Sequence, residues 1–285
     1  MVTQNSFLLG EEALKSGKRS LRSLSSHSRS SKGEKAEAVY VVINSKIKFT
    51  KSKEYVPRII PLTKKLDSLE NKSVLLVTKD PSIPYREKLT EKGSPTEDVF
   101  SDIFSFKRLK SQAKDGRKLI KIFKEYDIVV ADNRIHKFLP DVLGFQFFYK
   151  NKKIPYMVQM ALPEQDAMLT RGKKSTKLKD DRCDPKYVKS QMKAIARNAA
   201  FVAPHNGTCV VLKVGYTDWS TSDLLTNIND IVTYLTNQKY LPVGGMLRSV
   251  KNIKSVHLKT SDSISLPLYK AEKPPSDAAS DSDSD

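Results

Sequence analysis

Between residues 70 and 163, short apolar runs alternate with stretches of helical spacing. Three runs predict buried strands because they are apolar, rich in β-branched residues and bounded by polar ones: residues 72–81, 126–132 and 154–160. The stretches between them have the apolar spacing of helices, over residues 109–126 and around Ile135, Phe138, Leu139 and Val142. Strands and helices in this order, joined by right-handed crossovers, predict a three-layer α/β domain over residues 70–163.

The second half of the chain predicts two well-capped helices. Asp184 and Pro185 are an N-cap and a first-turn proline, and they predict a helix over residues 185–198. Ser220 with Asp223 resembles a capping box and precedes a wide apolar stripe. A second helix is therefore expected to begin there.

Strands are expected near both ends of the chain. Residues 208–214 form one apolar run. Residues 252–260 alternate apolar and polar side chains, which predicts a half-exposed strand, and residues 39–44 are its expected partner. Distant parts of the chain are thus expected to form one domain.

The ends of the chain differ in composition from the rest. Residues 20–38 are rich in Ser, Lys and Arg, so we expect a poorly ordered linker there, after a short helix around Leu8 to Leu24. Residues 1–35 together form a basic N-terminal extension. Residues 271–285 carry five acidic residues and one basic residue, which predicts a disordered tail suited to solvation or phosphorylation.

The net charge favours a polyanionic partner. The 285 residues include 50 Lys and Arg against 32 Asp and Glu, a net charge of +18. The basic N-terminal extension and the acidic tail cancel, so residues 36–270 hold that whole excess. Nucleic acid is the usual intracellular polyanion, and a merely soluble cationic surface is the alternative interpretation.

Composition also excludes several classes of protein. No apolar run approaches the length of a transmembrane helix, and the N-terminus lacks the features of a signal peptide, so we expect an intracellular protein. The two cysteines and four scattered histidines are too few for a disulfide framework or a zinc site. No metal and no cofactor is expected.

Four cations lie on one face of the helix predicted over residues 185–198. Helical rise spaces them over about 16 Å. A solvated helix face is the ordinary interpretation of such a run, and contact with RNA phosphates is the functional one. We call this set the basic ridge: Lys186, Lys189, Lys193 and Arg197.

Three segments agree in order and spacing with one known family. Residues 214–215 (Val-Gly) precede the capped helix that contains 223–228 (DLLTNI), a late strand ends at 259–260 (Lys-Thr), and 126–132 are followed by 139–144 (LPDVLG). The segments resemble the Val-Gly turn and helix, the Thr-Met-Gly strand end and the inserted-domain strand of the ribosomal protein L1 family.

The resemblance implies a two-domain ribosomal L1-like fold that combines α+β and α/β structure. A split α+β RNA-binding domain over residues 36–69 and 164–270 would be interrupted by an inserted Rossmann-like α/β domain over residues 70–163. Members of the family bind structured RNA chiefly through the split domain, using its first strand region and the Thr-Met-Gly loop.

Departures from the family pattern narrow the resemblance. Ser261 and Asp262 stand where the family has Met-Gly, and an aspartate there would repel phosphate. Tyr216 replaces a basic residue, and residues 145–149 (FQFFY) replace a Pro-Gly-rich loop. With these departures, the chain resembles a diverged branch of the family, which consists of nucleolar ribosome-assembly factors. Within that branch, it is similar to the member that belongs to the small-subunit processome.

The resemblance therefore implies a non-catalytic ribosome-biogenesis factor in the nucleus and nucleolus that binds structured pre-ribosomal RNA. Its implied partners are pre-ribosomal RNA and other small-subunit processome proteins, without a membrane or a small-molecule substrate. The contacts expected to neutralise phosphates lie near the first strand, on the basic ridge and at the last strand: Lys46, Lys48, Lys51, Lys53, Arg58, Lys186, Lys189, Lys193, Arg197, Lys254, Lys259 and Thr260.

Two alternatives remain open. One is a large-subunit assembly factor or protein scaffold of the same family. The other is an enzyme with a site beyond the strand ends, near Asp80 and Asp132. No glycine-rich phosphate motif follows Val77, and residues 172–175 lack the upstream glycine of a P-loop, so we expect both aspartates to cap turns or helices.

Two further segments are candidates for partner binding. The aromatic residues of 145–149 could dock a protein, with at least two of the rings as alternative core residues. Residues 171–180 are basic and are expected to form a mobile loop that gains order on RNA or protein.

Overall fold

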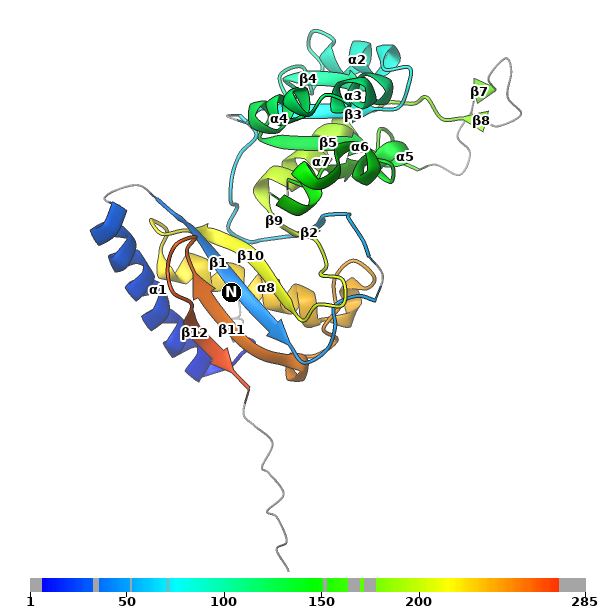
Figure 1. The fold of residues 1–285 in the computed structure, drawn as a ribbon. Helices are drawn as coiled ribbons and strands as arrows, with labels where there is room; N and C mark the ends of the chain where they lie inside the picture. Colours follow the sequence, from blue (N-terminus) through cyan, green and yellow to red (C-terminus); the bar gives the residue numbers. More distant parts are fainter. Residues whose placement is uncertain are drawn as a thin grey trace, which may run out of the picture. The chain divides into compact units, whose positions relative to one another are not determined.

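The computed structural model describes residues 7–32, 36–51, 53–70, 72–150, 153–163, 170–171 and 178–271. The chain folds as two compact units, and Figure 1 labels the elements of each. The split unit runs up to residue 51 and resumes at residue 204, and the inserted unit comprises residues 52–203. The predicted combination of α+β and α/β structure is confirmed.

The split unit is built on a four-stranded antiparallel sheet. The strand order is β10 (Cys209–Tyr216), β1 (Ala38–Ser45), β11 (Ile253–Lys259) and β12 (Leu266–Lys270). The predicted pairing of residues 39–44 with residues 252–260 is confirmed. Alternate side chains of β1 are buried and the others are half-exposed, because successive side chains of a strand point to opposite faces.

Two helices cover the buried face of this sheet: α1 (Glu11–Lys32) and α8 (Thr221–Thr236). The predicted cap of α8 is confirmed, with Ser220 at the N-cap. Gly215 allows α8 to approach the sheet, because a Cβ atom there would lie 2.6 Å from Leu224. The buried Asn227 side chain donates to the Val214 carbonyl at 2.8 Å. These contacts explain why a Val-Gly pair precedes the helix.

The helix α1 corrects the expectation for the N-terminal extension. The composition predicts a short helix followed by a linker over residues 20–38, but in the structure one helix continues to Lys32. Leu21 and Leu24 on its inner side are buried. A Cβ atom added at Gly17 would lie 2.9 Å from Leu225 of α8 and 3.2 Å from Leu268 of β12. The absence of a side chain at this position therefore allows α1 to pack closely on both elements.

The serines that suggested a linker hold this helix in place. Ser20 Oγ donates to the Pro267 carbonyl of β12 at 2.8 Å, and Ser25 Oγ donates to the Thr217 carbonyl at 2.8 Å. Because β12 is an edge strand, its outer carbonyls lack a strand partner, and serine hydroxyls satisfy one of them. Tertiary hydrogen bonds therefore stabilise a helix that its serine content alone disfavours.

The inserted unit is a three-layer α/β structure around a parallel sheet of order β4 (Asp102–Ser105), β3 (Val74–Thr78), β5 (Ile128–Asp132) and β6 (Tyr156–Val158). The strand β4 was not predicted, because four residues are too short a run to stand out. One core lies under α3, α4, α5 and α6 and the other under α2 and α7. The helices are α2 (Ile83–Thr90), α3 (Phe106–Ala113), α4 (Gly116–Glu125), α5 (Asn133–His136), α6 (Leu139–Phe145) and α7 (Pro185–Arg197).

The boundaries between the units differ from the predicted ones. The helix α7 was assigned to the split domain, but Val188 and Met192 pack in one core with Val74 and Leu76 of β3. The inserted unit also contains the antiparallel pair β2 (Arg58–Ile60) and β9 (Ala199–Phe201). An apolar stripe predicts that a helix is buried, but not which sheet it covers.

The aromatic segment at residues 145–149 is divided between core and surface. The helix α6 leads into a π-helical turn, η1 (Gln146–Lys150). Phe147 and Phe148 are buried, whereas Phe145 and Tyr149 are exposed. The expectation that at least two rings belong to the core is confirmed.

Short elements complete the described structure: β7 (Thr170–Arg171), β8 (Leu178–Lys179), η2 (Gln238–Tyr240) and η3 (Val250–Asn252). Within the described ranges, no helix combines the length and apolar character that a bilayer span requires. No group of three or more His, Cys, Asp or Glu side chains in those ranges suits a metal ion. The predictions for the acidic tail beyond residue 271 and for residues 172–177 lie outside the described residues.

Replacing Leu21 with Ala should destabilise the split unit by about 2 to 5 kcal/mol, because the side chain is 1% exposed and its loss leaves a cavity. Urea denaturation followed by circular dichroism measures this change. Ser23→Ala, on the exposed side of α1, is the control and should change stability by less than about 0.5 kcal/mol. A linker would tolerate both substitutions equally, so equal midpoints would contradict a docked helix.

Candidate nucleic-acid interface

The predicted RNA contacts lie on both units. Those of the split unit are Lys46, Lys48, Lys51, Lys254, Lys259 and Thr260, and those of the inserted unit are Lys53, Arg58, Lys186, Lys189, Lys193 and Arg197. The expectation that all of them belong to the split domain is wrong, because the inserted unit begins at residue 52 and includes α7.

A row of two lysines and a tyrosine crosses the sheet face opposite α1 and α8, which we call the open face. The strand register places Tyr40 of β1 beside Lys213 of β10 on one side and beside Lys259 of β11 on the other. The Lys213 Nζ atom donates to the Tyr216 hydroxyl at 2.6 Å and lies 3.9 Å from the centre of that ring. Strand pairing thus places a lysine on each side of Tyr40, while the Lys213 ammonium group contacts the Tyr216 ring. The sequence pattern does not predict Lys213 as a contact, because β pairing is not visible in local sequence.

The next two rows of the open face combine two valines with small or polar residues and have no acidic residue: Val211, Val42 and His257, then Cys209, Asn44 and Ser255. The Asn44 side chain donates to Ser255 Oγ at 3.0 Å, and His257 Nε2 lies 3.1 Å from the same oxygen. Val211 is 49% exposed, so solvent reaches this face. The open face therefore presents cations, a ring and neutral polar groups, which are the groups that bind phosphates and bases in RNA.

The strand end at Lys259-Thr260 differs from the prediction. Thr260 is 3% exposed, and its backbone N–H donates to Ser263 Oγ at 2.8 Å. Its side chain is therefore not on the surface, and the prediction that it contacts RNA is wrong for that side chain. The exposed residues of this loop are Ser261, Asp262, Ile264 and Ser265.

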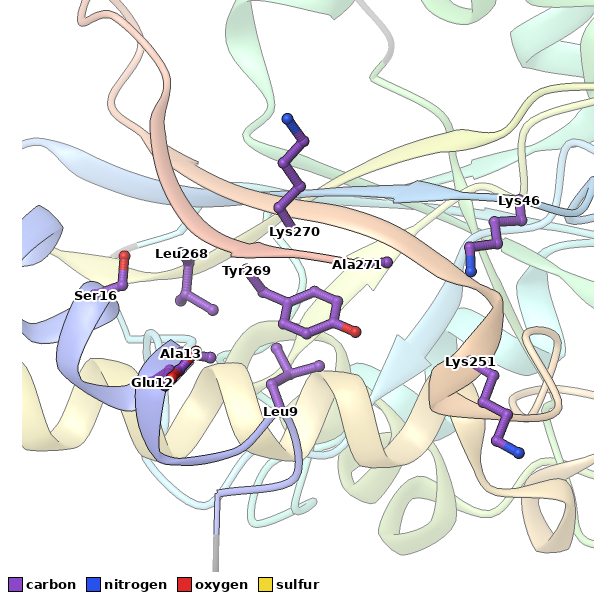
Figure 2. A pocket seen from close by; sticks show the side chains of 10 residues that line it. All are labelled: Leu9, Glu12, Ala13, Ser16, Lys46, Lys251, Leu268, Tyr269, Lys270 and Ala271. Atoms are coloured by element: carbon purple, nitrogen blue, oxygen red, sulfur yellow. The ribbon is translucent and has the colours of Figure 1, made fainter. Parts of the chain in front are cut away.

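Lys46 lines a groove of about 590 Å³ in the split unit. Figure 2 shows Lys46 and Lys251 on the side toward which the Tyr269 hydroxyl points, with Leu9 and Ala13 among the apolar lining. Lys251 was not predicted, because it lies in a 3-10 turn without a regular pattern. The remaining predicted lysines of this unit are exposed: Lys48, Lys51 and Lys254.

Lys53 of the inserted unit belongs to a cluster with Tyr55 and Tyr149. Its Nζ atom donates to the Tyr149 hydroxyl at 3.0 Å and lies 5.3 Å from the centre of each ring. Hydrogen bonding to the Tyr55 and Tyr149 hydroxyls raises the pKa of Lys53, so this side chain stays cationic. Arg58 is instead ion-paired with Glu54 at 2.7 Å, which makes it less available to phosphate.

The basic ridge on α7 lies beside acidic residues. Lys186, Lys193 and Arg197 are exposed and Lys189 is half-buried. Opposite charges in one groove lower the local positive potential. A groove of about 460 Å³ is lined by cations of the ridge and by three acidic residues: Lys189, Lys193, Arg197, Glu70, Glu97 and Asp98. The ridge is therefore a weaker anion site than its four cations suggest.

The aspartates considered for an enzyme stabilise the inserted unit. Asp132 is 0% exposed and ion-paired with Arg134, whose Nε lies 2.9 Å from Asp132 Oδ1. Arg134 also donates to the Tyr85 hydroxyl at 2.9 Å. This network links the segments after β3 and β5, at the strand-order reversal where doubly wound sheets bind ligands. Asp80 accepts from the Lys107 N–H at 3.0 Å, and Asp132 caps α5, as predicted.

Comparisons with known proteins agree on one family. The family model described as Ribosomal protein L1p/L10e family matches residues 24–264. The chain is similar to Ribosome biogenesis protein UTP30 of Saccharomyces cerevisiae, with 40% identity over 237 residues that cover 81% of this chain and 80% of that protein. It is also similar to Ribosomal L1 domain-containing protein 1 of Mus musculus, with 26% identity over 185 residues, 65% of this chain and 33% of the mouse protein.

Replacing Arg134 with Met should destabilise the inserted unit by about 3 to 5 kcal/mol, because it leaves the Asp132 carboxylate buried without its partner. Chemical denaturation of the two proteins measures the difference. Arg182→Met is a matched control, since Arg182 also pairs with an aspartate two residues earlier, Asp180. That pair is partly exposed, so its loss should cost less than about 1 kcal/mol. Equal losses would contradict a special role for the Asp132 network.

Proposed function

Because the chain belongs to the ribosomal protein L1p/L10e family, we propose that it is a ribosome-biogenesis factor that binds structured pre-ribosomal RNA through the open face of the split unit. The family and the name of the yeast relative point to a non-enzymatic protein. Its action is to neutralise phosphates and to fit the shape of an RNA segment, without a chemical step.

The row of Lys213, Tyr40 and Lys259 carries this proposal. Directly opposite residues of antiparallel strands are separated by about 5 Å, so strand pairing places Lys213 and Lys259 on either side of Tyr40. The lysines can bind neighbouring phosphates while the ring stacks on an unpaired base. The row stands on paired strands instead of loops, so less conformational freedom is lost when RNA binds.

The loop after β11 supports the strand face as the contact surface. Asp262 is exposed there, and its negative charge disfavours a phosphate at the loop itself. Thr260 is buried, which leaves Lys259 as the member of the predicted strand end that reaches the surface. RNA would then contact the sheet more than the loop.

The proposed place of action is the nucleolus, in the small-subunit processome. The yeast relative is named a ribosome biogenesis protein, and the sequence departures resemble the diverged branch of assembly factors. Pre-ribosomal RNA and other processome proteins would be the partners. The alternative is the large-subunit assembly pathway, which the same fold and charge would equally suit.

Reversing both lysines of the row, in Lys213→Glu/Lys259→Glu, should weaken binding of a short RNA hairpin and lower the slope of log K against log salt by about two. Fluorescence anisotropy at several salt concentrations measures both quantities. Lys193→Glu/Arg197→Glu on the basic ridge changes the net charge equally and should have a smaller effect, because acidic side chains already offset these cations. Equal losses from the two variants would mean that only net charge matters.

In-cell crosslinking followed by sequencing of the attached RNA tests the pathway. We expect small-subunit precursor RNA, with crosslinked peptides from β1, β10 and β11, because these strands form the open face. Large-subunit precursor RNA would favour the alternative pathway. Absence of RNA above background would contradict the RNA-binding proposal.

A further inference from the structure

The outer side of α1 presents a stripe of cations: Lys15, Lys18, Arg19, Arg22 and Arg29. All of these residues are exposed. At 3.6 residues per turn they fall within an arc of about 100°, and at 1.5 Å per residue they extend over about 21 Å. The acidic residues Glu11 and Glu12 are confined to the first turn, where their negative charges interact favourably with the positive end of the helix dipole. We call this stripe the α1 outer face.

The helix that carries these cations is held in place by packing and by hydrogen bonds. The inner side of α1 packs its buried leucines on the split unit, and Gly17 brings the helix close to α8 and β12. The hydrogen bonds of Ser20 and Ser25 to backbone carbonyls hold its middle turns. Among the residues that the structure describes, none of the five cations forms an ion pair. Beyond Glu11 and Glu12 in the first turn, the helix has no carboxylate, whereas the basic ridge shares its groove with three.

The composition of the α1 outer face suits a phosphate backbone better than a protein partner. After the first turn with Glu11 and Glu12, the other exposed positions of the helix are Ser23, Ser26 and His27, which are polar and able to hydrogen-bond. Protein interfaces have apolar and aromatic residues at their centre, and this stripe has none. Cations spaced by one helical turn, about 5.4 Å, can meet successive phosphates of a nucleic-acid strand.

The α1 outer face and the open face are separate surfaces of the split unit. The helix α1 packs against α8 and along the edge strand β12, so its outer side points away from the sheet, whereas the open face is the face of the sheet that the helices do not cover. Figure 1 shows α1 beside β12, apart from β10 at the other edge of the sheet. One RNA helix cannot easily cover both surfaces.

We propose that the α1 outer face is a second RNA-binding surface, which holds the phosphate backbone of a separate RNA segment, so that the split unit bridges two segments. This inference rests on the proposed function, because it takes the open face as the first surface. Bridging of this kind would bring together parts of a precursor RNA that are distant in sequence.

The first test is charge reversal on the α1 outer face of the full chain, in Lys18→Glu/Arg19→Glu/Arg22→Glu. With a short mixed-sequence RNA duplex as the probe, we expect weaker binding and a smaller slope of log K against log salt, by about one for each lost contact. The control is Lys110→Glu/Lys121→Glu/Lys124→Glu on exposed positions of α3 and α4, which changes net charge equally. An equal effect in the control, or none in the α1 variant, overturns the proposal.

The second test measures bridging directly. Two short RNA hairpins, one carrying a donor dye and the other an acceptor, should show energy transfer when the wild-type chain is added. The α1 variant and Lys213→Glu/Lys259→Glu should each still bind one hairpin but lose the transfer. If transfer persists in the α1 variant, the bridging proposal is overturned and the proposed function is not. If the wild-type chain binds no hairpin at all, both proposals fail.

Discussion

The antiparallel pairing of β1 with both β10 and β11 is the constraint on which the split unit depends. It joins a strand near the start of the chain to two strands that follow the inserted unit. The buried side chains of β1 form part of the apolar surface on which α1 and α8 pack: Val39, Val41 and Ile43. The entropy of closing a loop rises only with the logarithm of its length, so a folded unit of residues 52–203 can be inserted after β1 without preventing this pairing.

The same pairing divides the sheet of the split unit into a side that packs on the helices and a side that is the proposed RNA-binding surface. Because side chains alternate along each strand, the apolar residues of β1 face the helices and Tyr40, Val42 and Asn44 face outward. The helices then shield the apolar side completely, and the outward side carries lysines contributed by β10 and β11. The core and the proposed RNA-binding surface therefore use different residues of the same strands, so substitutions on the open face need not affect the core.

The neighbours of a cation decide what it can bind. Lys189, Lys193 and Arg197 stand in regular helical order, but they share a groove with carboxylates, and Arg58 is paired with Glu54. Lys213 and Lys259 lack regular spacing in the sequence, yet strand pairing places them on either side of Tyr40. A cluster of cations attracts phosphate more effectively than the same number of cations beside carboxylates.

Local spacing was sufficient to identify α7, α8, β1 and β11, the two kinds of domain, and the helix caps at Ser220 and Asp184, because each of these features depends on residues a few positions apart. The family resemblance also rested on such short segments. Local spacing could not predict that α1 continues through its serines, that α7 covers the inserted sheet, that Thr260 is buried, or that Lys213 stands beside Tyr40. Each of these depends on a partner far away in the chain, and only the register of distant strands and the packing of distant side chains selects that partner.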